Sequence, residues 1–283
     1  MDKDLNEIAS KLIRPIRELM LNPGLSAHEK QLCLGAAWQA VLSGMGYNNF
    51  QNEDLTGEKG FIINVLAPMN PQVCVDVGAN CGTYSTMLLD YTSSHVFAFE
   101  PLQEPFHALA SLGAAGGRAG RFHALNQAVS NKTGTAKIKF NPSSTSFASL
   151  AEEASNVSYV DNSSEATVET ITLDDHFYGN TAIDFIKIDT EGFEMEVLEG
   201  AQLLLSGQHA PPPKAIQIEF NLHHIFRGHS LWMLAQKLKD YHAFQLLPGG
   251  QLIHRDTTTA AANIFSYSNF VFIRSDLIQK RPS

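Results

Sequence analysis

Residues 73–85 have the sequence VCVDVGANCGTYS, an apolar run that passes into a glycine-containing turn and then into residues that can begin a helix. Similar apolar, β-branched runs occur at 95–99 (HVFAF), 183–188 (IDFIKI), 215–220 (AIQIEF) and 269–274 (NFVFIR), with helical patterns in much of the intervening sequence. Apolar strands separated by helices are typical of a parallel sheet that is covered on both faces. The sequence therefore predicts an α/β fold with a ligand at the carboxyl edge of its strands.

The glycine turn after residue 77 differs from the dinucleotide-binding pattern G-x-G-x-x-G. In that pattern the second glycine leaves room for a pyrophosphate, and the third lets helix and strand pack closely. Asn80 and Thr83 occupy these two positions. The turn therefore suits a cofactor without a pyrophosphate, such as S-adenosylmethionine, although a tight turn that needs glycine only for its backbone remains an alternative.

An acidic residue follows the next predicted strand. Glu100 ends the run HVFAFE and lies 24 residues after Asp76. A carboxylate at this place can accept hydrogen bonds from both ribose hydroxyls of a nucleoside. Glu100 alone would also fit a solvated surface position, but together with the glycine turn it favours an adenosine-containing cofactor.

Charged residues gather at the ends of the predicted strands 183–188 and 215–220. Lys187, Asp189 and Glu191 alternate with apolar residues, and Glu219 and His223 share one face of the next strand if the extended chain continues that far. Buried charges are costly unless they pair with each other, a metal or a substrate. We expect a catalytic cluster here; a purely structural ion network around Lys187 is the alternative.

If the cofactor is S-adenosylmethionine, methyl transfer to an acceptor such as an alcohol would require alignment of the reactants and removal of a proton from a poor nucleophile. Asp189 and Glu219 can hold Mg²⁺ through oxygen ligands, and such an ion would lower the pKa of the alcohol. Alternatively, His223 or His224 accepts the proton near neutral pH. Neighbouring side chains of an extended chain face opposite sides, so we prefer His223, with Lys187 and Glu191 in supporting roles.

Five motifs resemble those of the FkbM-type S-adenosylmethionine-dependent methyltransferases. They are DVGANCG at 76–82, FEP at 99–101, LNQAVSNKTG at 125–134, ITLDD at 171–175 and IDFIKIDTEGFEMEVLEGA at 183–201. The resemblance covers about residues 71–275. It implies a class I methyltransferase (Rossmann-like) fold, with a seven-stranded, mostly parallel sheet and an antiparallel last strand. It also implies O-methylation of a hydroxyl on a sugar or secondary metabolite.

The resemblance further implies which residues hold the cofactor: the glycine turn surrounds the methionine part, Glu100 binds the ribose and the segment 126–128 passes the adenine. The expected cofactor contacts are Asp76, Gly78, Ala79, Asn80, Gly82, Thr83, Tyr84, Glu100, Pro101, Asn126, Gln127, Ala128 and Asp189. Two alternatives are an NAD-dependent oxidoreductase, which would share Glu100, and a non-catalytic cofactor-binding module on the same fold.

Two segments lie outside the predicted sheet. Residues 1–60 show apolar residues at helical spacing and are predicted to form an N-terminal helical extension to a methyltransferase domain at 61–283. This extension packs on the domain or forms a lid or a dimer surface, so a homo-oligomer is possible. Residues 141–170 are rich in Ser, Thr, Asn and Glu and are predicted to be a long loop insertion, either decoration or an active-site lid.

Composition limits the partners. Lys and Arg number 20 against 29 Asp and Glu, and the formal charge of −9 argues against nucleic acid. Cys33, Cys74 and Cys81 lack the spacing of a disulfide framework or a zinc site. No run of 18 apolar residues and no signal-peptide pattern occurs. We therefore expect a cytoplasmic protein without a membrane partner, acting on a small-molecule or glycan hydroxyl.

Overall fold

The computed structural model describes residues 2–114, 118, 120–179, 181–208 and 210–278. The chain forms two compact units, residues 1–48 and residues 49–283. Residues 49–60, which the sequence analysis placed with the N-terminal extension, thus belong to the larger unit. Among the described residues, no helix combines the length and the apolar character needed to cross a membrane.

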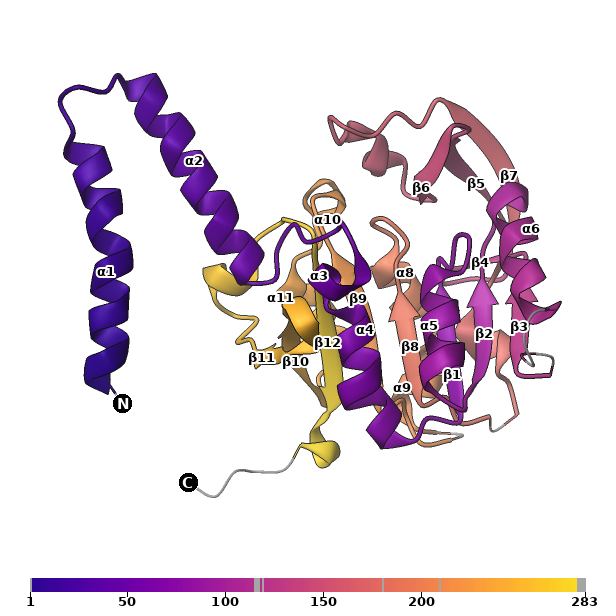
Figure 1. Ribbon diagram of the computed structural model, residues 1–283. Helices are drawn as coiled ribbons and strands as arrows, with labels where there is room; N and C mark the ends of the chain where they lie inside the picture. Colours follow the sequence, from indigo (N-terminus) through magenta and orange to yellow (C-terminus); the bar gives the residue numbers. More distant parts are fainter. Residues whose placement is uncertain (1, 115–117, 119, 180, 209, 279–283) are drawn as a thin grey trace. The chain divides into compact units, whose positions relative to one another are not determined.

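The smaller unit is a pair of helices, α1 (Asp2–Leu21) and α2 (Ala27–Gly44), which confirms the predicted helical character (Figure 1). Ser26 begins α2 with a capping box: its hydroxyl accepts from the Glu29 backbone N–H, and the Glu29 carboxylate accepts from the Ser26 backbone N–H. Apolar side chains remain exposed along α1, for example Leu12 at 67% and Ile8 at 54%.

The larger unit is built on an eight-stranded sheet of order β11-β10-β12-β9-β8-β1-β2-β3. Its parallel strands are β1 (Val73–Val77), β2 (His95–Phe99), β3 (Phe122–Leu125), β8 (Phe185–Ile188) and β9 (Ala215–Phe220). The remaining three are β10 (Tyr241–Leu246), β11 (Leu252–His254) and β12 (Ser268–Arg274), each antiparallel to its neighbours.

The predicted parallel α/β sheet and the antiparallel last strand, β12, are confirmed. The predicted count of seven strands is wrong, because β11 adds an edge strand beside β10. It has only three residues and follows the Pro248–Gly250 turn, so it is too short to show a periodic sequence pattern.

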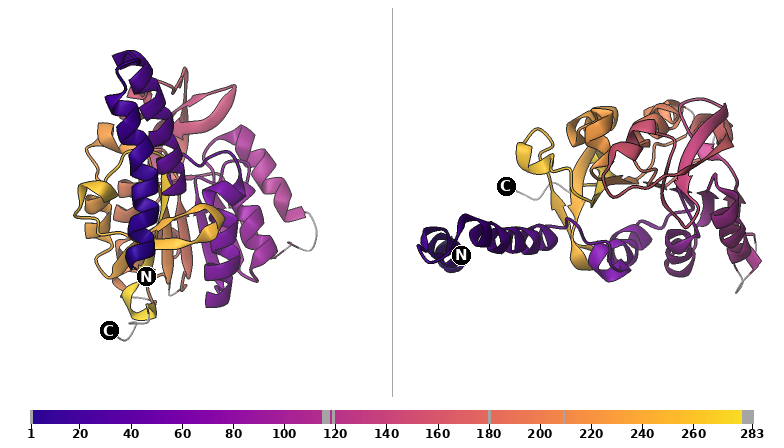
Figure 2. Two further views of the ribbon diagram at one scale, coloured as in Figure 1. Left: turned by 60° about the vertical axis from the view of Figure 1, so that its left-hand side comes forward. Right: turned by 90° about the horizontal axis from the view of Figure 1, so that it is seen from above.

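Helices cover both faces of this sheet, as the view from above shows (Figure 2). One face packs against α8 (Glu194–Glu199) and α11 (Leu231–Lys237), with Val75, Ile186 and Ile218 pointing towards them. The other face carries Cys74 and Phe185 and packs against α5 (Thr83–Tyr91) and the helical segment that begins with α4 (Glu58–Phe61). This alternation places successive residues of each strand in opposite cores.

The other helices are short. They are α3 (Glu53–Thr56), α6 (Gln103–Ser111), α7 (Leu173–His176), α9 (Gln202–Ser206) and α10 (His223–Arg227).

A second sheet takes up part of the predicted loop at 141–170, so the prediction of a loop throughout this stretch is wrong. Its order is β4-β7-β5-β6, with β4 (Ala128–Val129), β5 (Gly134–Asn141), β6 (Ser144–Ser149) and β7 (Ser164–Ile171). In β7 exposed Glu165, Thr167 and Glu169 alternate with the inward Ala166 and Val168. A sheet with such a small core needs few apolar residues, which explains why its composition resembles a loop.

Candidate active site

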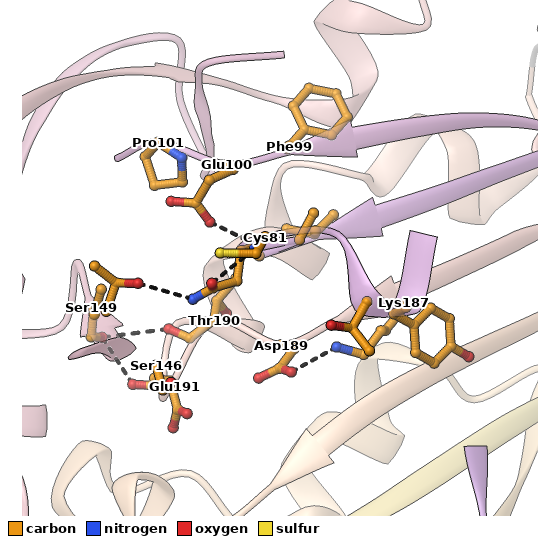
Figure 3. Close-up of a pocket in the computed structure, with 18 of the residues that line it drawn as sticks. Cys81, Phe99, Glu100, Pro101, Ser146, Ser149, Lys187, Asp189, Thr190 and Glu191 are labelled. Atoms are coloured by element: carbon orange, nitrogen blue, oxygen red, sulfur yellow. Dashed lines mark hydrogen bonds and ion pairs between the residues drawn. The ribbon is translucent and has the colours of Figure 1, made fainter. Parts of the chain in front are cut away.

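A cavity of about 560 Å³ opens at the carboxyl ends of β1, β2 and β8 (Figure 3). The turn after β1, residues 78–81, and Glu100 after β2 form one end, which we call the cofactor end. Asp189, Thr190 and Glu191 after β8 form the other, the acceptor end. Residues of β6 and its flanks cover both ends, so the second sheet forms part of the site rather than decoration.

The glycine turn is fixed by a close approach of two strand ends. Gly78 has φ +80°, and a Cβ at this position would lie 1.8 Å from the backbone oxygen of Asp189. The backbone N–H groups of Gly78 and Ala79 both donate to the Phe99 carbonyl, at 3.1 and 3.0 Å. Only glycine allows this packing, so the turn needs Gly78 for steric reasons as well as for its conformation.

Glu100 presents a buried carboxylate at the cofactor end. Its Oε2 accepts from the Asn80 backbone N–H at 2.9 Å and its Oε1 from the Leu102 N–H at 2.8 Å. Burial nevertheless raises the pKa of Glu100 to about 7, because the side chain is only 5% exposed. A ligand that donates hydrogen bonds to this carboxylate would stabilise its charged form.

Ten of the thirteen residues expected to hold the cofactor line the cavity. They are Gly78, Ala79, Asn80, Thr83, Tyr84, Glu100, Pro101, Gln127, Ala128 and Asp189.

The other three residues lie behind the lining. Asp76 is fully buried within β1 and accepts from the Ser85 hydroxyl at 2.7 Å. Asn126 donates to the Glu100 and Pro101 carbonyls at 2.9 and 3.0 Å, so it positions the Glu100 segment. Gly82 leaves room for helix packing, since its Cβ would lie 2.3 Å from a Leu112 methyl group.

Lys187 and Asp189 form a partly buried ion pair at the acceptor end. The Lys187 Nζ lies 2.6 Å from the Asp189 Oδ2 and 5.0 Å from the centroid of the Tyr84 ring (Figure 3). Burial opposes the charge of Lys187, but Asp189, Asp76 and Glu58 together raise its pKa well above the usual range. The ion pair proposed as the structural alternative for Lys187 therefore exists, and Lys187 holds the Asp189 carboxylate at the cavity.

Three carboxylates converge at this end. Asp189, Glu191 and Glu219 each place an oxygen within 4.8 Å of the other two. The Asn221 amide bridges two of them, donating to Glu191 Oε2 at 2.9 Å and to Glu219 Oε1 at 2.8 Å. Burial and the neighbouring carboxylates raise the pKa of both Glu191 and Glu219. Asp189 and Glu191 line the cavity, whereas Glu219 lies behind them.

The prediction that His223 faces the acceptor on an extended chain is wrong. Strand β9 ends at Phe220, and His223 begins helix α10, where its side chain is fully buried. The Asn221 side-chain oxygen accepts from the His223 backbone N–H at 3.0 Å, which turns the chain away from the strand direction. The His223 Nδ1 lies 2.8 Å from Glu191 Oε2, so His223 can act on a substrate only through Glu191.

His224 does not reach the cavity lining either. Its Nε2 lies 3.1 Å from Glu194 Oε2 in a buried pair.

The sequence analysis missed several lining residues, which come from β6, from α4 and from loops. Ser149, at the end of β6, donates to the Glu191 carbonyl at 2.8 Å and ties the second sheet to the acceptor end. The Asn80 amide donates to the Thr145 hydroxyl at 3.3 Å and ties it to the cofactor end. Phe50, Glu58 and Tyr267 also line the cavity. None of these residues belongs to a recognisable motif.

Comparison with known proteins assigns the family. The family model described as the methyltransferase FkbM domain matches residues 76–244. No curated protein matches the chain.

Several solved structures are similar to this chain at low sequence identity. Precorrin-6y C5,15-methyltransferase from Geobacter metallireducens GS-15 is 8% identical over 81% of this chain and 92% of its own, with a TM-score of 0.43. The 1,6-didemethyltoxoflavin-N1-methyltransferase from Burkholderia thailandensis is 13% identical over 90% and 94%, with a TM-score of 0.40. An O-methyltransferase from Bacillus cereus, solved with SAH, is 11% identical over 91% and 94%, with a TM-score of 0.38.

The family match covers more than half of the chain and includes both ends of the cavity. This chain therefore belongs to the FkbM methyltransferase family and is an S-adenosylmethionine-dependent methyltransferase of the class I fold.

Proposed function

We propose that this protein transfers the methyl group of S-adenosylmethionine to a hydroxyl of a sugar or secondary metabolite. The observation that carries the proposal is a single cavity with a carboxylate suited to ribose at one end and paired carboxylates suited to an alcohol at the other. A cytoplasmic location remains part of the proposal.

At the cofactor end Glu100 accepts the ribose hydroxyls, and the turn at 78–80 faces the methionine part. Gln127 and Ala128 lie beside the adenine. Two backbone N–H groups already hold the Glu100 carboxylate in place, so its orientation is set before the cofactor arrives. Such preorganisation lowers the entropic cost of binding.

At the acceptor end Asp189 orients the acceptor hydroxyl and Glu191 takes its proton. S-adenosylmethionine bound at the cofactor end would supply the methyl group to the acceptor oxygen and would leave as S-adenosylhomocysteine, while Glu191 would accept the hydroxyl proton. The raised pKa of Glu191 makes it a stronger base than an exposed carboxylate. The His223 Nδ1 lies 2.8 Å from Glu191 Oε2 and orients this carboxylate.

Mg²⁺ belongs to the proposal as an optional partner of the same carboxylates. Asp189, Glu219 and Glu191 together offer carboxylate oxygens, which are the ligands that Mg²⁺ prefers. A bound ion would lower the pKa of the acceptor alcohol. Activity that survives exhaustive chelation, with no gain on adding Mg²⁺, would remove the metal and leave Glu191 alone as the base.

Calorimetric titration with S-adenosylhomocysteine tests the cofactor assignment. We expect binding to the full chain, a large loss in Glu100→Ala, and no binding of NAD⁺. Binding of NAD⁺ without binding of S-adenosylhomocysteine would contradict the proposal.

A panel of hydroxyl acceptors, followed by mass spectrometry with S-adenosylmethionine, tests the reaction. Cofactor binding without methylation of any member would support the alternative of a non-catalytic module. Methylation at nitrogen or carbon alone would correct the atom that receives the methyl group.

A further inference from the structure

Part of the cavity wall comes from residues outside the family-matched segment 76–244. Phe50 and Glu58 precede that segment, and Tyr267 follows it, yet all three line the cavity. The rings of Phe50 and Tyr267 meet edge to face, with centroids 6.0 Å apart. We call these three residues the outer wall. A wall built from residues outside the family-matched segment is well placed to select the acceptor.

The outer wall belongs to the acceptor end. The carboxylates of Glu219, Glu58 and Asp189 raise the pKa of the Tyr267 phenol, after burial as the main cause. Gln217, which pairs with Lys187 across β8 and β9, donates to Glu58 Oε1 and to Asn269 Oδ1, each at 2.8 Å. The Asn269 amide in turn donates to the Tyr267 hydroxyl at 3.3 Å. Tyr267 and Glu58 therefore lie near the reacting hydroxyl rather than near the ribose.

Glu58 is held rigidly. Its Oε1 accepts from the Gln217 amide at 2.8 Å, and Gln217, fully buried in β9, accepts from the Tyr84 hydroxyl at 2.6 Å. Gly57 precedes it with φ +81°, and a Cβ there would lie 2.1 Å from the Leu247 carbonyl oxygen. The backbone of α4 is therefore locked in place, and the carboxylate keeps one orientation.

Glu58 shares the positive charge of Lys187 with Asp189 and Asp76. Lys187 forms its ion pair with Asp189, and His223 lies against Glu191. Among the residues that the structure describes, no ion pair within 4.0 Å includes Glu58, and its hydrogen-bond partners are neutral. Burial raises the pKa of Glu58, and the charge of Lys187 opposes that rise, so the counter-charge available to Glu58 is incomplete. A cationic ligand would supply that charge.

We propose that the outer wall binds a protonated amino group, so that the acceptor is an amine-bearing polyol such as an amino sugar. This inference rests on the proposed function and narrows its substrate class. The faces of Phe50 and Tyr267 attract an ammonium group through their negative quadrupoles. Glu58 supplies the opposite charge beside them, and a carboxylate or phosphate on the acceptor would be repelled.

Calorimetric titration of the full chain saturated with S-adenosylhomocysteine tests the amine. The ligands are glucosamine, N-acetylglucosamine and glucuronate. We expect glucosamine to bind at least tenfold more tightly than N-acetylglucosamine, and glucuronate to bind least. Glu58→Gln keeps an acceptor for Gln217 and should abolish the preference. Phe50→Ala, at a side chain that is 65% exposed, should weaken glucosamine without affecting folding.

Glu104→Gln, an exposed carboxylate on α6, makes the same charge change away from the cavity and should leave the preference intact. Equal binding of the amine and its acetylated form, binding of none of the three, or a preference that persists in Glu58→Gln would overturn the inference. Failure of the unmodified protein to bind S-adenosylhomocysteine would instead overturn the proposed function, so the two failures are distinguishable.

Discussion

The two ends of the cavity are built in different ways. The cofactor end consists largely of one turn and one carboxylate, each placed directly after a parallel strand, and backbone N–H groups fix both. The acceptor end consists of side chains from β8 and the turn after it, from β9 and α4, and from the loops before α3 and β12, held by one another. The cofactor end depends on backbone geometry, and the acceptor end depends on contacts between side chains. Single substitutions should therefore affect the two ends differently.

The largest effect should come from Gly78→Ala. A methyl group would collide with the Asp189 carbonyl, and φ +80° is strained for alanine. The turn after β1 packs against the end of β8, so the substitution should disturb both ends of the cavity. We expect loss of S-adenosylhomocysteine binding by calorimetry and a clear fall in the melting temperature. The matched control is Gly249→Ala, also at positive φ but with open space for a Cβ, which should cost far less.

Lys187→Met should have the next largest effect. It leaves Asp189 and the buried Asp76 without their cation, a loss of about 3–5 kcal/mol when a buried pair is broken. We expect a lower free energy of unfolding in urea. The double variant Lys187→Met with Asp189→Asn should recover part of that stability; no recovery would mean that Lys187 stabilises the fold through packing rather than charge.

Glu191→Gln should separate the two ends. It removes the proposed base but keeps the side-chain volume, so kcat should fall by about 10²–10⁴, the usual contribution of a general base. Affinity for S-adenosylhomocysteine should change less than twofold. His223→Gln should reduce kcat less than Glu191→Gln does, because it acts only through that carboxylate. A larger fall in kcat for His223→Gln than for Glu191→Gln would mean that the histidine, and not Glu191, is the base.

The pH dependence of cofactor binding should report on Glu100. Its pKa of about 7 means that the carboxylate becomes protonated as the pH falls through 7, and it then loses its capacity to accept both ribose hydroxyls. Affinity for S-adenosylhomocysteine should therefore rise from pH 6 to pH 8, by up to about tenfold per unit on the acidic side. Calorimetry at several pH values measures this, and Glu100→Gln should give a nearly flat profile.

The smallest effect on either end should come from the N-terminal helices. We propose that α1 and α2 mediate self-association, because apolar side chains such as Leu12 and Ile13 are exposed along α1. Leu12→Glu should lower the molar mass found by light scattering and leave cofactor affinity unchanged. A monomeric unmodified chain would contradict the self-association.

The cofactor end could be predicted from the sequence because each of its parts is local. The strand, the turn and Glu100 lie within 30 residues, and the end of each apolar run marks where its strand ends. Asp76 was predicted to contact the cofactor, but its side chain is buried within the strand and does not line the cavity.

The acceptor end could be predicted only in part. Asp189, Glu191 and Glu219 were found because parallel neighbouring strands end at one edge. His223 was misjudged because Asn221 turns the chain after β9, an effect that alternation alone does not reveal. Glu58 and Tyr267 reach the cavity only through the tertiary fold, and neither has a local pattern that marks it.

The most direct test of the account compares two variants in one calorimetric experiment with S-adenosylhomocysteine. Glu100→Ala should lose most of its affinity, whereas Glu191→Gln should bind like the unmodified protein while failing to methylate. Equal affinity in both variants, or a loss only in Glu191→Gln, would contradict the assignment of one end to the cofactor and the other to the acceptor.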